Sequence, residues 1–103
     1  MTDKYKIGPI SGYYTGDMWG GRPDVDSKRY KTLTEARKKA FEYATYGKCH
    51  VFSPAGYKDG KNLIITHYFS RGYAVKKYGK IMWVASPVDK WILRKDGTLG
   101  RKL

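Results

Sequence analysis

The chain has 103 residues, of which 21 are Lys or Arg and 9 are Asp or Glu, so its formal net charge at pH 7 is +12. A hydrophobic share of 41% and an aromatic share of 16% exclude a disordered basic tail, because such tails lack the apolar residues that build a core. The length favours a single domain over residues 1–103, and the lone cysteine excludes both an internal disulfide and a cysteine-rich zinc site.

Glycine and proline punctuate the first third of the chain. Residues 4–31 contain five Gly and two Pro, and these residues interrupt regular structure at short intervals. We therefore predict only short strands there, near residues 4–8 and 11–15. The stretch Trp19–Asp26 is predicted to be a loop.

One segment repeats its apolar residues with a helical period. The stripe on one face consists of Leu33, Ala36, Ala40, Phe41 and Ala44. Thr32 and Glu35 match the capping box that satisfies the first free N–H groups of a helix. Gly47 is placed to end the helix in the left-handed conformation. The pattern predicts a helix at about 33–46.

After this helix the sequence is typical of β-structure. Val, Ile, Tyr, Phe and Trp are concentrated in five segments, which are Lys48–Ser53, Asn62–Ser70, Tyr73–Tyr78, Lys80–Ser86 and Trp91–Lys95. Asp59-Gly60, Tyr78-Gly79 and Asp96-Gly97 suit tight hairpin turns. The tail Thr98–Leu103 either pairs as a last short strand or remains a loose basic end. The predicted fold class is α+β, with one helix packed on a mainly antiparallel sheet of about five to seven short strands.

No membrane or export signal accompanies this pattern. The first ten residues contain no apolar stretch of signal-peptide length, and the longest apolar run, Ile81–Ala85, is far too short to span a bilayer. A single thiol fits a reducing compartment. We therefore expect a soluble intracellular protein, in the cytoplasm or the nucleus, without a membrane partner.

The positive charge is concentrated in the β-rich part. Residues 1–47 carry nine basic and six acidic side chains, whereas residues 48–103 carry twelve basic and three acidic ones. No acid occurs between Gly60 and Val88. Self-repulsion at this charge density weakens a small fold. Binding to a polyanionic partner, DNA or RNA, explains why the chain carries this excess of positive charge.

The segment around Tyr78-Gly79 is the candidate contact surface. A two-residue turn there places Lys77 opposite Lys80, a like-charge pair that is unfavourable without an anion between the two ammonium groups. Tyr rings near it are suited to stacking on unpaired bases, at about 1–3 kcal/mol per base. The candidate nucleic-acid contacts are Arg71, Tyr73, Lys76, Lys77, Tyr78, Lys80, Arg94 and Lys95. Lysines at strand ends also protect sheet edges from aggregation, and Trp83 and Trp91 are expected in the core.

The two histidines, His50 and His67, allow a catalytic alternative. With Asp59-Gly60 as a two-residue turn, His50 faces Phe69 and Phe52 faces His67, so the imidazoles are diagonal neighbours about 7–8 Å apart at the backbone. Such a pair suits metal-independent RNA cleavage by general acid and base. A packed, structural His67 is the other interpretation.

Neither a metal nor another cofactor is expected. Two His and one Cys supply too few ligands for a closed zinc site. Cys49 is interpreted as a small residue at the start of a strand, and not as a nucleophile.

Three functions follow from these patterns. The first is a non-catalytic nucleic-acid-binding protein that contacts phosphates with limited sequence preference, since no helix-turn-helix, zinc-finger or RRM signature is present. The second is an interaction protein, such as a virion component or an inhibitor, that docks on an acidic protein surface. The third is a small ribonuclease that uses His50 and His67.

Overall fold

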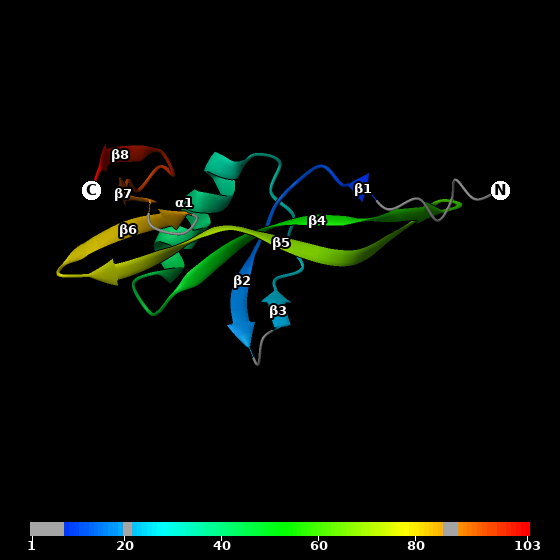
Figure 1. Cartoon of the computed structure of the whole chain (residues 1–103), viewed down its shortest axis with the longest axis horizontal. Coiled ribbons are helices and arrows are strands. Elements are labelled where there is room, and N and C mark those ends of the chain that lie inside the picture. The colour runs from blue at the N-terminus through cyan, green and yellow to red at the C-terminus, as the bar shows by residue number, and fades with distance from the viewer. Residues whose placement is uncertain (1–7, 20–21, 86–88) are drawn as a thin grey trace.

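The computed structural model describes residues 8–19, 22–85 and 89–103 and contains one helix on an antiparallel sheet (Figure 1). The helix is α1 (Leu33–Tyr43). The strands are β1 (Gly8–Pro9), β2 (Tyr14–Trp19), β3 (Arg22–Val25), β4 (Cys49–Asp59), β5 (Asn62–Lys77), β6 (Lys80–Ala85), β7 (Asp89–Leu93) and β8 (Leu99–Lys102). Their order is β3-β2-β4-β5-β6-β7-β8, and β1 also pairs with β4. The α+β class is confirmed, with eight strands where five to seven were predicted.

The capping box begins α1 as predicted. The Thr32 hydroxyl accepts a hydrogen bond from the Glu35 N–H at 3.1 Å, and the Glu35 carboxylate accepts one from the Lys31 N–H at 3.2 Å. The predicted stripe faces the sheet, with Ala36, Ala40 and Ala44 buried and Leu33 and Phe41 packed beside them. Within the described ranges no helix is long and apolar enough to cross a membrane.

The end of the helix differs from the prediction. The helix stops at Tyr43, and Ala44–Tyr46 form a turn. Gly47 is not left-handed, so its predicted role as a left-handed cap is wrong. The Tyr43 carbonyl instead accepts hydrogen bonds from the N–H groups of Tyr46 and Gly47, at 2.9 and 3.2 Å. The last carbonyls are therefore satisfied without positive φ.

The long β4–β5 ribbon corrects several predicted strand bounds. The predicted strands Asn62–Ser70 and Tyr73–Tyr78 are parts of one 16-residue strand, β5, and the predicted break between them is a β-bulge. Gly72 in this bulge has φ 131°. The preceding strand, β4, continues through Pro54 to Asp59, and Pro54 pairs with Tyr68. On the other side, the Pro54 carbonyl accepts a hydrogen bond from the Ile10 N–H at 3.1 Å.

The two ends of the described chain add short strands. The second predicted strand, near 11–15, is shifted to β2, and the predicted Trp19–Asp26 loop contains β3, which pairs with β2. Of the predicted strand near 4–8, only Gly8 lies inside the described residues, where β1 pairs with Gly56 and Ala55. The tail pairs with β7 as β8.

Helix α1 covers one face of the sheet and encloses Trp83. The indole is 2% exposed, which confirms Trp83 as a core residue, and Trp91 packs half-buried against the same core. The Arg37 guanidinium lies 5.7 Å from the centre of the Trp83 ring, and its Nε donates to the Gly97 carbonyl at 2.9 Å. This contact fastens the β7–β8 turn to the helix.

The Gly72 bulge supplies a test of the fold. A Cβ at Gly72 lies 2.6 Å from the Val84 carbonyl oxygen and 2.7 Å from the Trp83 ring, at a φ that side chains disfavour. Gly72→Ala is expected to lower the free energy of unfolding by at least about 2 kcal/mol. Urea denaturation followed by circular dichroism measures the loss.

Gly47→Ala is the matched control, because a Cβ at Gly47 meets no atom within 4 Å and φ is not positive there. This variant is expected to be neutral or slightly stabilising. A strongly destabilised Gly47→Ala protein contradicts the observed helix end.

Candidate nucleic-acid interface

The β5–β6 hairpin has the register predicted from its turn. Lys77 pairs with Lys80, Val75 with Met82 and Tyr73 with Val84. The turn residues Tyr78 and Gly79 have φ of 54° and 75°, as the twist of a two-residue hairpin turn requires. Tyr78 is the one non-glycine residue with positive φ among the described residues. The geometry of this turn therefore places Lys77 directly opposite Lys80.

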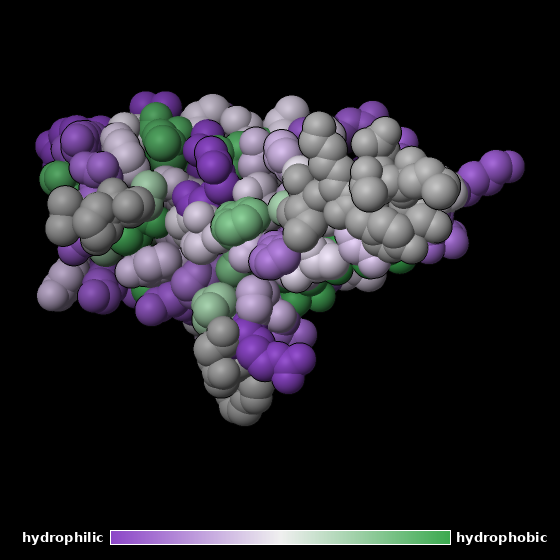
Figure 2. All heavy atoms as spheres, turned by 45° about the vertical axis from the view of Figure 1, so that its right-hand side comes forward, coloured by the Kyte–Doolittle hydropathy of each residue, from purple (hydrophilic) through white to green (hydrophobic). Residues whose placement is uncertain are grey.

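We call Lys76, Lys77, Tyr78 and Lys80 the hairpin tip. Its three lysines are exposed, and the Tyr78 side chain is 94% exposed. The ion pairs in the described ranges are Lys39–Glu42 and Lys102–Asp89, so the tip lysines have no acidic partner there. Figure 2 shows hydrophilic residues, among a few hydrophobic ones, at the end of the molecule where this hairpin lies in Figure 1.

Arg94 and Lys95 follow the strand next to the tip. The β6–β7 pairing ends at Met82 and Ile92, and β7 ends at Leu93, so Arg94 is not paired with Lys80. The Arg94 guanidinium is partly engaged, because it donates to the Leu99 carbonyl at 3.2 Å. Lys95 is exposed in the β7–β8 turn, and its charge contributes to lowering the pKa of Glu42, after the larger effect of Lys39. Arg94 is thus held by the β7–β8 turn, and Lys95 lies toward the helix.

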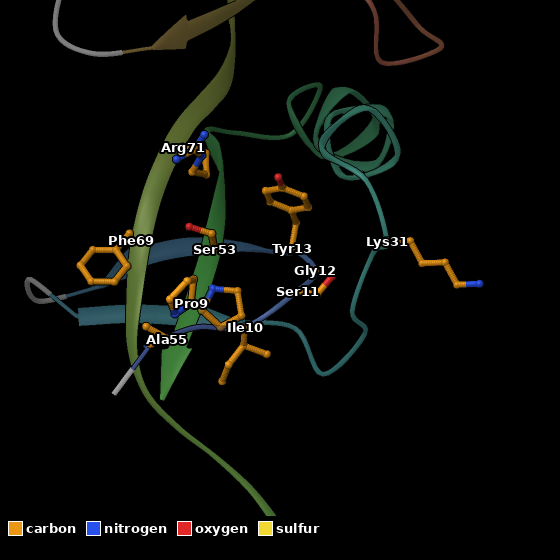
Figure 3. A pocket seen from close by; sticks show the side chains of 12 residues that line it. Pro9, Ile10, Ser11, Gly12, Tyr13, Lys31, Ser53, Ala55, Phe69 and Arg71 are labelled. Atoms are coloured by element: carbon orange, nitrogen blue, oxygen red, sulfur yellow. The ribbon is translucent and has the colours of Figure 1, made fainter. Parts of the chain in front are cut away.

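Arg71 and Tyr73 lie away from the hairpin tip, on the body of the sheet. Arg71 is the unpaired residue of the bulge and borders a hollow of about 520 Å³ that Tyr13 and Ile10 also line (Figure 3). Tyr73 is half-buried, with the His50 ring 5.1 Å away and the Lys48 ammonium 4.6 Å from its ring centre. The Tyr73 ring is therefore partly occupied by the protein's own side chains. The predicted contact residues do not form one continuous patch.

The histidine pair predicted from the sequence is wrong. The β4–β5 turn consists of Gly60 and Lys61, and Arg71 and Thr66 are extra residues in β5, so the register shifts at each step. His50 pairs with Tyr73 and not with Phe69, and His67 pairs with Ala55. Five positions of β4 separate His50 from Ala55, which is roughly 16 Å.

His50 and Ala55, the partner of His67, are also five residues apart on β4. An odd separation on a strand places side chains on opposite faces of the sheet. His50 stacks on Phe52, and His67 stacks on Phe69, each with its same-face neighbour. The two imidazoles therefore cannot act on one phosphate. This geometry removes the basis of the ribonuclease interpretation.

The two histidines differ in burial and in hydrogen bonding. The His50 Nδ1 is buried without a hydrogen-bond partner in the described part of the chain. Burial, with the nearby Lys48 charge, lowers the pKa of His50. His67 is exposed, and its Nδ1 lies 2.7 Å from the Thr66 hydroxyl oxygen.

The structure also places a second basic cluster that the sequence pattern did not single out. Lys28, Arg29, Lys31, Lys38 and Lys39 surround a hollow of about 560 Å³ beside Tyr30. Glu35 and Glu42 line the same hollow, and Glu42 pairs with Lys39 at 2.9 Å. The acids offset part of the charge here, in contrast to the hairpin tip. The cluster joins residues before the helix to residues on it, so only the folded arrangement brings it together.

No metal centre is formed by the described residues. They contain no group of three or more His, Cys, Asp or Glu side chains that is able to hold a metal ion. Cys49 is buried at the start of β4, and burial raises the pKa of its thiol to about 11. A thiol with this pKa is almost entirely protonated at neutral pH.

The buried thiol makes a direct prediction. Because the pKa of Cys49 is about 11, an aromatic disulfide reagent at pH 8 is expected to react with the folded protein far more slowly than with the chain in denaturant. Absorbance of the released thiolate measures both rates. Equal rates contradict the burial of Cys49.

Comparisons with protein-family models, with curated proteins and with solved structures found no match for this chain.

Proposed function

We propose that this protein is a non-catalytic nucleic-acid-binding protein that holds the phosphate backbone at the hairpin tip. The observation that carries this proposal is the direct pairing of Lys77 with Lys80 at an exposed turn without an acidic partner in the described ranges. Like charges on residues that pair directly across two strands repel each other. A phosphate between them converts that repulsion into two charge-assisted hydrogen bonds.

The shape of the hairpin supports contact with a strand of nucleic acid. A two-stranded ribbon is narrow enough to enter a major groove or to lie along a phosphate backbone. Tyr78 projects from the turn at 94% exposure, where its ring is available to a sugar or an unpaired base. Arg94 follows β7, the strand next to β6, and adds a further positive charge.

This mode of binding gives affinity with little sequence preference. Lysine binds phosphate as a point charge and does not distinguish base pairs. Each phosphate contact releases condensed counterion, so the affinity falls as salt is added.

The proposal is tested by neutralising the tip. Lys76→Gln, Lys77→Gln and Lys80→Gln are combined in one variant, and Lys28→Gln, Lys31→Gln and Lys38→Gln form a charge-matched control on the helix side. Anisotropy titrations use single- and double-stranded DNA and RNA of one length. The tip variant is expected to lose at least about tenfold more affinity than the control at the same salt concentration.

Two outcomes count against the proposal. Equal losses in the two variants mean that bulk charge alone is responsible and that the tip has no special part. An absence of binding to every nucleic acid at low salt overturns the proposed function. Capture of an acidic protein that survives nuclease treatment then favours a protein partner.

A further inference from the structure

Strand β5 is paired on both edges over only part of its length. Tyr73 and Ala74 pair with both β4 and β6, and Val75–Lys77 pair with β6. Among the described residues, Asn62–Ser70 pair with β4 alone. In Figure 1 this half of the ribbon has β1 on the β4 side, and no described strand is paired with its β5 side. We call Asn62–Ser70 the open edge. Its outward N–H and C=O groups are a template for a further strand.

The open edge contains the bulge at Thr66, but it lacks the short length, the proline and the charges of the outermost strands. The outermost strands, β3 and β8, have only four residues each, and they carry Pro23 or the charges of Arg101 and Lys102. Short length, proline and charge all discourage strand addition. The open edge has nine residues and contains no charged residue, no Pro and no Gly. In a chain with 21 basic residues, this neutral stretch stands apart.

Apolar side chains are exposed along this stretch. Leu63, Ile64 and Phe69 are 42%, 36% and 56% exposed. Figure 3 shows the Phe69 ring beside β5, where Phe69 also borders the hollow that Arg71 lines. Exposed apolar groups beside unpaired backbone are the usual features of a strand that another chain completes.

The composition of the open edge points to its occupant. Thr66 is the extra residue of a bulge and divides the edge into two halves. The first half carries Leu63, Ile64 and Ile65, and the second carries His67, Tyr68 and Phe69. An antiparallel copy of the segment places aliphatic residues beside aromatic ones in both halves, and such cross-strand pairs are favourable. The segment is thus complementary to itself.

We propose that the open edge is a dimer interface, at which a second copy of this chain adds its own Asn62–Ser70 in antiparallel orientation. The two-fold arrangement uses the same segment twice and closes, so that it yields a dimer and not a filament. It continues a sheet whose described strand pairs are all antiparallel. This inference does not depend on the proposed nucleic-acid binding.

Charge gives the dimer a distinctive response to salt. Each copy carries a net charge of +12, with Lys58 and Lys61 beside the open edge. Salt screens the repulsion between the copies, whereas the pairing itself is uncharged. Dimer formation therefore strengthens as salt is added, which is the opposite of phosphate binding.

The first experiment is sedimentation equilibrium of the whole chain over a range of concentrations at low and high salt. The wild type is expected to show a monomer–dimer equilibrium that shifts toward dimer at high salt. Leu63→Lys with Phe69→Lys is expected to weaken dimerisation at least about tenfold. Met18→Lys with Tyr46→Lys changes two apolar residues that are 41% and 93% exposed elsewhere, and this control is expected to dimerise as the wild type does.

The second experiment needs no variant. Backbone amides of the open edge are expected to gain protection from hydrogen exchange as the wild-type concentration rises, whereas those of Tyr73–Lys77 stay unchanged because β6 already covers them. A wild type that remains monomeric at every concentration and salt overturns the proposal. So do equal losses in the edge and control variants, or concentration-dependent protection that spares Asn62–Ser70.

Discussion

The antiparallel pairing of β4 with β5 is the interaction on which the other elements of this protein depend. Strands β1 and β2 attach to β4, and β6 attaches to β5. The helix packs on the middle of the ribbon, where Val51 and Ala74 are fully buried. At the bulge, Gly72 leaves room for Trp83 to approach the backbone. A substitution that disrupts this ribbon is therefore expected to disturb the strands and the helix that attach to it.

The ribbon also separates two kinds of surface. The β4–β5 turn and the β5–β6 turn lie at opposite ends of the long axis of the molecule (Figure 1), which is 53 Å in extent. The β5–β6 turn carries the hairpin tip, where Lys77 faces Lys80 and neither has an acidic partner among the described residues. The stretch of β5 nearer the other turn carries no formal charge and exposes apolar side chains, and no described strand pairs with its outer edge. The proposed phosphate contact at one end and the proposed strand pairing toward the other respond oppositely to salt, which weakens the first and strengthens the second.

Sequence reasoning succeeded where local chemistry decides the structure. Thr32 and Glu35 define the start of the helix because their side chains satisfy nearby backbone N–H groups. Tyr78-Gly79 defines the β5–β6 register because a two-residue turn with positive φ leaves one pairing. The class of fold followed from these signals and from the Val-, Ile- and Tyr-rich segments.

Sequence reasoning failed where contacts between residues far apart in the sequence determine the structure. The bulges at Arg71 and Thr66 shift the register of β5 against β4, and nothing in the alternation of side chains marks them. The expected placement of His50 and His67 as diagonal neighbours failed for this reason. Tyr73 was placed among the exposed contacts because its burial depends on His50 and Lys48 across the sheet. The open edge was likewise invisible, because it exists only where β6 stops covering β5.

The central claim is that the lysines of the hairpin tip contact phosphates. The most direct measurement is the slope of the logarithm of the association constant against the logarithm of salt concentration, for the wild type and for the variant with Lys76, Lys77 and Lys80 changed to Gln. Each lost phosphate contact reduces the slope by about 0.7–0.9. The account predicts a slope that is shallower by about 2 to 3 in the variant. An unchanged slope contradicts it, because the tip then contributes no phosphate contact.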